Sequence, residues 1–187
     1  MGREATAHFK ELALLDKTYQ AQGELGVLTD TLDCTGTAVA HQQSYIPSHQ
    51  QLLDAIQSLG SSYDQAPPLF SALKFKGKRL YALAREGTMC LQKLYAIADL
   101  KKRAVDLLSL TLTDYHAPFF TIEARVSHGT YIRSLVNDIA RLTESCATTQ
   151  ALTRIAIGPL HISNAIHLEK LTSLQALQDN AIDAPTL

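Results

Sequence analysis

Three clusters of polar residues in this 187-residue sequence could support chemistry. The sharpest is residues 127–133 (Ser-His-Gly-Thr-Tyr-Ile-Arg), where Arg133 falls in the first turn of a helix predicted to follow Gly129. The amino end of a helix already favours anions, so a guanidinium there points to a carboxylate or phosphate partner. An exposed arginine that pairs with a surface acid such as Asp138 or Asp30 explains the same pattern equally well.

The second cluster, residues 29–33 (Thr-Asp-Thr-Leu-Asp), follows an alternating segment that is typical of a strand. Its two acids could form an acid–base pair. The turn-forming preferences of Asp and Thr explain the cluster as well, and we favour that structural interpretation.

The third cluster, residues 71–79, surrounds an aromatic residue, Phe75, with cations, a combination that can hold a phosphate backbone. The cations are Lys74, Lys76, Lys78 and Arg79. A solvated basic loop is the alternative interpretation.

The net charge of −1 conceals an uneven distribution along the chain. Residues 74–103 contain nine basic and two acidic residues, an excess of seven positive charges, and the other residues contain eight basic and 16 acidic ones. A near-neutral average argues against a nucleic-acid-binding protein, but this polarised distribution predicts a basic face that could meet a polyanion.

Several functional classes leave no trace in the sequence. Common nucleotide-binding, hydrolase and metalloprotease motifs are absent, and no two of the seven histidines have the spacing of helical metal ligands, so we expect no metal site. The three cysteines are far apart, which argues against a disulfide framework. No apolar run is long enough for a membrane span and no signal-peptide core follows Met1, which predicts a cytosolic type of chain.

The elements that must position these clusters are predicted to be a mixture of helices and strands. Apolar periodicity and capping signals predict helices over residues 5–15, 48–59, 79–86, 130–142 and, more weakly, 168–177. Alternation predicts strands over residues 19–27, 105–113 and 120–126. Since the strands do not alternate strictly with helices, we expect an α+β fold in which helices flank a mixed, largely antiparallel sheet.

Taken in order, these segments resemble the TruB-type tRNA pseudouridine synthases. The resemblance runs from about residue 2 to residue 160 and is carried by residues 16–19 (Asp-Lys-Thr-Tyr), 23–36, 67–74 (Pro-Pro-Leu-Phe-Ser-Ala-Leu-Lys), 77–87, 129–135 (Gly-Thr-Tyr-Ile-Arg-Ser-Leu), 152–154 (Leu-Thr-Arg) and 158–159. Several specific blocks in one order are a stronger signal than any single motif.

The resemblance implies the pseudouridine synthase fold and the isomerisation of uridine to pseudouridine at position 55 in the T-loop of tRNA, without a cofactor or metal. The target base would be flipped out of the loop into a pocket. Tyr19 matches the tyrosine that packs on the flipped base, Arg133 the arginine that pairs with the catalytic aspartate, and Leu152 an apolar residue of the base pocket. The RNA-binding residues would be Lys74, Lys76, Lys78 and Arg79.

The sequence departs from the family pattern at its start. The family's nucleophilic aspartate lies in a segment of the type Gly-His-x-Gly-Thr-Leu-Asp-Pro, and residues 2–6 (Gly-Arg-Glu-Ala-Thr) resemble a later block. We therefore expect an N-terminally truncated chain without the nucleophile, inactive as it stands. Neither Asp30 nor Asp33 is expected to replace it, since a substitute would have to meet Arg133 at catalytic distance.

We expect residues 1–165 to form a partial catalytic domain and residues 166–187 a C-terminal tail with a short helix, without a separate C-terminal RNA-binding domain. The expected partner is the T-arm of tRNA, and the protein is expected to be a monomer without membrane contact, in the cytoplasm or alternatively in the nucleus or an organelle. Two alternatives stay open: a non-catalytic RNA-binding paralogue, and an unrelated protein with a basic segment.

Overall fold

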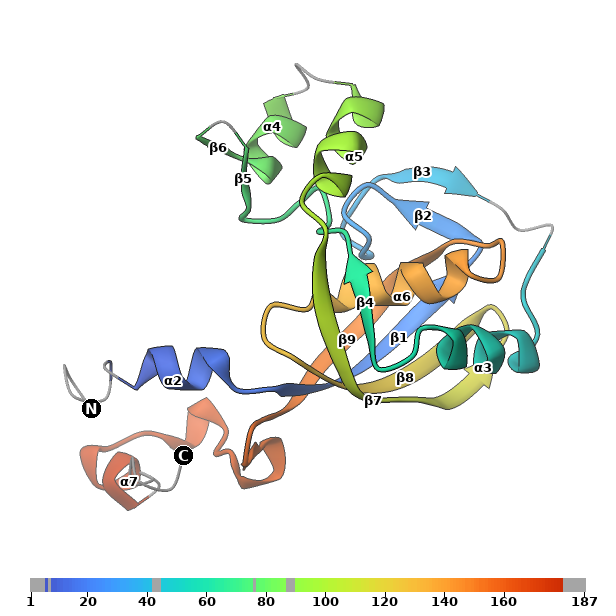
Figure 1. Ribbon diagram of the computed structural model, residues 1–187. Coiled ribbons are helices and arrows are strands. Elements are labelled where there is room, and N and C mark those ends of the chain that lie inside the picture. Colours follow the sequence, from blue (N-terminus) through green and yellow to red (C-terminus); the bar gives the residue numbers. More distant parts are fainter. Residues whose placement is uncertain (1–5, 7, 42–44, 76, 87–89, 180–187) are drawn as a thin grey trace.

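The computed structural model describes residues 6, 8–41, 45–75, 77–86 and 90–179. Its centre is a six-stranded sheet in which every neighbouring pair of strands is antiparallel (Figure 1). The strand order is β10 (Leu160–His161), β9 (Ala147–Ile157), β1 (Lys17–Leu25), β8 (Phe119–Val126), β7 (Arg103–His116) and β4 (Ser62–Gln65). This sheet and its flanking helices confirm the predicted α+β class.

Two helices, α6 (Ile132–Arg141) and α3 (His49–Ser58), pack on the sheet and share its main core. Helix α3 begins with the predicted capping box between Ser48 and Gln51. The core joins the inward residues of the strands to the apolar stripe of α6, and its larger members include Leu25, Leu52, Phe120, Ile122, Leu135, Val136 and Ile139. Leu142, predicted to extend the stripe, is instead 52% exposed because the helix ends before it.

Strand β1 meets helix α6 closely at Gly23. A Cβ atom there would lie 2.5 Å from the ring of Phe120 and 2.8 Å from the side chain of Val136. The glycine therefore allows the sheet and α6 to pack without a gap, which fixes the height of the helix over the strand.

Residues 66–102, which we call the insertion, connect β4 to β7, and the helices and strands within this range stand away from the sheet (Figure 1). They comprise β5 (Lys74–Phe75), β6 (Lys78–Arg79), α4 (Leu80–Glu86) and α5 (Leu91–Asp99). The insertion has its own small core, formed by Leu69, Leu80, Leu83, Leu94, Ile97 and Ala98. Helix α4 was predicted, whereas α5 was not, although Leu94, Ile97 and Ala98 carry a helical spacing.

The sequence also failed to predict strand β9. Its residues 147–149 are all buried and its residues 151–154 are all exposed. Two register shifts also interrupt its pairing with β1, so no alternating pattern develops. The predicted strand over 19–27 ends at Leu25, because Gly26 takes a φ of +80° and begins a new hairpin of β2 (Val27–Thr29) and β3 (Ala38–His41).

The terminal elements are short. They are α2 (Phe9–Leu14), the 3-10 turns Ile162–Asn164 and Leu168–Lys170, and α7 (Leu174–Asp179), none of which contains a buried residue. The predicted helix over 168–177 is thus divided into a turn and a separate helix. Across the described ranges, no helix is long and apolar enough to cross a membrane.

Candidate functional site

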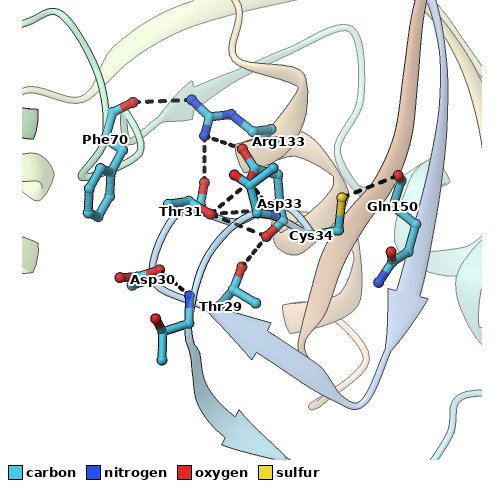
Figure 2. Close-up of polar contacts among 10 residues, drawn as sticks. Thr29, Asp30, Thr31, Asp33, Cys34, Phe70, Arg133 and Gln150 are labelled. Carbon is cyan, nitrogen blue, oxygen red and sulfur yellow. Dashed lines mark hydrogen bonds and ion pairs between the residues drawn. The ribbon is translucent and has the colours of Figure 1, made fainter.

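The side chain of Arg133 projects from the first turn of α6 to the loop between β2 and β3 (Figure 2). Its Nη1 donates to Oδ2 of Asp33 at 2.8 Å and to the carbonyl of Thr31 at 2.7 Å, and its Nη2 donates to the carbonyl of Phe70 at 3.1 Å. The carboxylate partner is therefore Asp33 and neither of the two acids suggested by the sequence. The guanidinium also joins this loop to the insertion through Phe70.

Asp33 uses its two carboxylate oxygens differently. Oδ1 accepts hydrogen bonds from the Thr31 hydroxyl at 2.8 Å and from the backbone N–H of Thr35 at 3.0 Å, which is the turn chemistry expected of this cluster. Oδ2 faces Arg133. Partial burial would raise the pKa of Asp33, but the bonds from Thr35 and Thr31 and the charge of Arg133 outweigh it and hold that pKa below its ordinary value.

The loop that carries Asp33 is attached to the edge of strand β9. Cys34 donates its backbone N–H to the carbonyl of Thr149 at 3.0 Å, and Thr149 donates its own to the carbonyl of Leu32 at 3.0 Å. Leu32 has a φ of +61°, a rare conformation for a leucine, yet its side chain is buried. Backbone pairing and a buried anchor thus hold this strained turn in place.

Arg133 and Asp33 line a pocket of about 290 Å³ together with Leu152. Its other lining residues are Cys34, Thr149, Gln150 and Ala151. The structure therefore brings together two of the residues singled out in the sequence, Arg133 and Leu152. It adds Asp33, for which the sequence favoured a turn role and which does meet Arg133. The pocket combines a cation, a carboxylate and an apolar wall.

Tyr19 does not line this pocket but shares a sheet face with Leu152. On the paired strands β1 and β9, Ala21 lies opposite Leu152 and Tyr19 lies opposite Arg154, without a register shift between the two pairs. Since opposed residues, and every second residue along a strand, point to the same face, the Tyr19 ring and Leu152 lie on the side that α6 covers. Tyr19 is half-buried and packs against the main core.

Three of the predicted RNA-binding cations, Lys74, Lys78 and Arg79, lie on strands β5 and β6 of the insertion. Lys74 pairs with Arg79 across the hairpin, and Lys78 forms an exposed ion pair with Glu86 at 3.1 Å. The guanidinium of Arg79 lies 5.8 Å from the centre of the Tyr81 ring. Lys76 lies outside the described residues. The basic cluster and the pocket therefore belong to different parts of the molecule, linked by the bond from Arg133 to Phe70.

Asp138, the acid of α6 that the sequence suggested as a partner of Arg133, points to strand β4 instead. It accepts a hydrogen bond from the Tyr63 hydroxyl at 3.1 Å. Burial raises its pKa to about 6, despite this bond and the charges of Arg141 and Lys102. In the part of the chain that the structure describes, no group of three or more His, Cys, Asp or Glu residues is arranged to hold a metal ion.

Comparisons with known proteins connect this architecture to one family. The profile described as "TruB family pseudouridylate synthase (N terminal domain)" matches residues 1–132. A tRNA pseudouridine synthase B of Syntrophobacter fumaroxidans is 34% identical over 184 residues, which are 98% of this chain and 56% of the relative. One from Thermosipho melanesiensis is 38% identical over 151 residues, 81% of this chain and 47% of the relative. The chain thus spans about half the length of these relatives.

Solved structures agree on the fold. A Cbf5-Nop10-Gar1 complex contains a chain with a TM-score of 0.58 at 19% identity, covering 91% of this chain and 40% of that one. A chain of an H/ACA RNP bound to a substrate RNA containing 2'-deoxyuridine has a TM-score of 0.60 at 15% identity. This match covers 97% of the present chain and 41% of that one. These likenesses concern the fold, while the profile and the sequence relatives identify the family. The chain belongs to the TruB family of pseudouridylate synthases.

Proposed function

We propose that this chain provides the uridine-binding part of a tRNA pseudouridine synthase that acts on position 55 of the T-loop. The observation that carries the proposal is the pocket in which Arg133, Asp33 and Leu152 meet, in a chain of the TruB family. The polypeptide would meet tRNA in the cytoplasm and bind it as a monomer, without a metal or cofactor.

In this proposal the pocket receives a uridine that has left the base stack. Leu152 supplies an apolar wall for the base, and Tyr19, on the same sheet face, packs on it once the pocket is filled. Arg133 is held by a carboxylate and two carbonyls, so its position is fixed before the substrate arrives. Such preorganisation avoids ordering the guanidinium during binding.

The basic hairpin of the insertion would contact the phosphate backbone of the T-arm. Lys74, Lys78 and Arg79 are exposed, and Tyr81 beside Arg79 adds an aromatic surface. Contacts to phosphate depend strongly on salt because they release counterions. We expect a T-arm hairpin to bind this chain at least about tenfold more weakly at 200 mM than at 50 mM salt.

A matched pair of variants tests the role of the hairpin. Arg79→Gln removes a cation from the basic cluster, and Arg125→Gln removes an exposed cation from strand β8, outside the insertion. Arg79→Gln should reduce both the affinity and the salt slope, whereas Arg125→Gln should change neither. Equal effects of the two substitutions would contradict a specific role of the hairpin.

We further expect the 187 residues to bind RNA without isomerising uridine, because none of them matches the family's nucleophile segment. Release of tritium from tRNA labelled at C5 of uridine measures the reaction directly. Turnover by this chain would show that a carboxylate within it, with Asp33 the first candidate, performs the nucleophile's role. A chimera with the Gly-Thr-Leu-Asp segment of a TruB relative ahead of Met1 should release tritium, and the same chimera with that Asp changed to Asn should not.

The second candidate function is that of a non-catalytic RNA-binding paralogue. It is favoured by one observation, that Asp33 already occupies the guanidinium of Arg133. If the chimera binds the hairpin as tightly as the native chain but releases no tritium, this second function is supported instead.

A further inference from the structure

Helix α6 begins without a cap of its own. Tyr131 is its N-cap residue, and the Tyr131 side chain makes no capping hydrogen bond. Tyrosine lacks the short oxygen-bearing side chain that favours this position. The helix start, two residues before Arg133, must therefore be fixed by something outside the helix.

The side chain of Gln65, at the end of strand β4, binds both backbone polar groups of the N-cap residue. Its Oε1 accepts the backbone N–H of Tyr131 at 2.7 Å, and its Nε2 donates to the Tyr131 carbonyl at 3.1 Å. In a capping box, a Glu or Gln of the helix itself accepts the N–H of the N-cap residue. Here a glutamine from a distant strand takes that role and also holds the carbonyl.

Gln65 is itself held firmly. It is 1% exposed, and its remaining amide hydrogen is donated to the Tyr63 hydroxyl at 2.6 Å. Tyr63 in turn donates to Asp138, in the middle of α6. The amide therefore has a partner for each of its donors, and the network returns to the helix whose start it binds. A buried amide whose donors and acceptor are all paired is held in one geometry.

A second set of contacts to the helix start comes from strand β7, which pairs with β4. Gln65 lies opposite Arg103, whose side chain donates to the carbonyl of Gly129 and lies over the Tyr131 ring with 5.7 Å to its centre. Gln65 and Arg103, which are neighbours at this edge of the sheet, thus both contact residues 129–131, directly ahead of α6. Contacts from the sheet, rather than contacts within the helix, therefore fix the position of the helix start.

We propose that Gln65 is a positioning residue that aims Arg133 into the pocket. Arg133 makes three bonds of 2.7 to 3.1 Å to groups on two separate segments, and hydrogen bonds of this kind weaken steeply when their geometry changes. A small shift or rotation of the first turn would break at least one of them. The inference rests on the proposed function, since it gives Arg133 its role in holding the uridine.

Replacement of Gln65 by methionine, which has a similar length and no hydrogen-bonding amide, tests the proposal. The order of the Arg133 guanidinium can be measured by the heteronuclear NOE of its Nε–Hε group, without any RNA. Gln65→Met should lower this NOE and weaken binding of a T-arm hairpin about tenfold, in line with the loss of a buried hydrogen-bonding group. In an Arg133→Met background, Gln65→Met should weaken binding no further.

The control is Leu52→Ala, which removes a fully buried side chain of α3 from the same core and leaves the hydrogen bonds between Gln65 and Tyr131 in place. All variants are compared at a temperature at which each is fully folded. Leu52→Ala should lower the melting temperature but leave both the NOE and the affinity unchanged. If it lowers them as much as Gln65→Met does, Gln65 has only a structural role and the inference is wrong.

Tyr63→Phe provides a milder test, which applies even if Gln65→Met does not fold. It removes the hydroxyl that supports Gln65 while leaving the two bonds to Tyr131, and it should weaken binding about threefold with a smaller fall in the NOE. An unchanged NOE in this variant would contradict the inference. If Arg133→Met binds RNA normally, the proposed function fails instead, and the NOE still decides whether Gln65 positions Arg133.

Discussion

One carboxylate contacts helix α6 from outside and another belongs to the helix, and their pKa values are shifted in opposite directions. Asp33, on the β2–β3 loop, meets Arg133 in the first turn, and its pKa is lowered. Asp138, in the middle of the helix, faces Tyr63 on strand β4, and its pKa is raised to about 6. The helix thus carries an ion pair, Arg133 with Asp33, on the side of the pocket. On the side of strand β4 it carries a carboxyl group, Asp138, that is protonated more easily than usual.

The difference lies in how many groups compensate each charge. Burial acts to raise the pKa of both carboxyl groups, but at Asp33 the hydrogen bonds from Thr31 and Thr35 and the ion pair with Arg133 outweigh it. Asp138 is more deeply buried and accepts a hydrogen bond from Tyr63, and the charges of Arg141 and Lys102 act on it without either cation lying at ion-pair distance. Ionisation in a protein interior depends on hydrogen-bond donors and opposite charges in direct contact, and the pocket supplies more of these direct contacts.

The largest effect is expected from Arg133→Met. It leaves the Asp33 carboxylate partly buried without its cation, and we expect a loss of about 3 kcal/mol in the free energy of unfolding, at the low end for a buried pair because each side chain is about a quarter exposed. Urea denaturation at pH 7 measures it. Arg125→Met, which breaks a more exposed ion pair with Asp16, is the control and should change stability by about 0.5 kcal/mol or less.

Asp138→Asn should increase the free energy of unfolding, whereas Arg133→Met decreases it. A raised pKa means that the folded protein favours the protonated form, so stability from this group is full below the unfolded pKa near 4 and is lost as pH rises through about 6. Asparagine stays neutral, and we expect it to stabilise the fold by about 2 kcal/mol at pH 7.5. Thermal unfolding at pH 7.5 and pH 4 should show this gain disappearing at the lower pH. A gain of equal size at both values would exclude ionisation as its cause.

Asp33→Asn should destabilise the fold by about 1 kcal/mol at pH 7, since the amide keeps an oxygen for its neighbours but loses the charge opposite Arg133. The stability that the carboxylate contributes is present above its unfolded pKa and is lost as pH falls through its lower folded pKa. The gap between variant and native chain should therefore close only in strong acid. Denaturation curves at pH 7 and at pH 2 check this, and a gap already closed at pH 5 would contradict the lowered pKa.

The smallest effect is expected from Tyr63→Phe. Loss of the hydrogen bond to Asp138 should destabilise the fold by about 0.5 to 1 kcal/mol, and the pKa of Asp138 should rise further because this bond lowers it. Carbon-13 NMR titration of the Asp138 carboxyl measures the pKa directly. If it falls instead, the two carboxylates differ for a reason other than the supply of donors.

Local chemistry was predictable from the sequence wherever neighbouring residues decide the outcome. The capping box at Ser48, the apolar stripe of α6 and the turn role of residues 29–33 depend on residues within one or two turns of chain, and each is present in the structure. The block order was sufficient to identify the TruB family. Strand β9 could not be predicted, because its register shifts and its uneven burial obscure the alternation.

The assembly of the site was decided by the tertiary structure. Arg133 and Asp33 are 100 residues apart in the sequence, and Gln65 on strand β4 is 66 residues from Tyr131. No local sequence pattern therefore connects the members of either pair. The sequence by itself determined that a guanidinium stands at the start of a helix and needs an anion. Only the folded sheet, by pinning the β2–β3 loop to β9 and strand β4 to the helix start, decided which carboxylate supplies that anion.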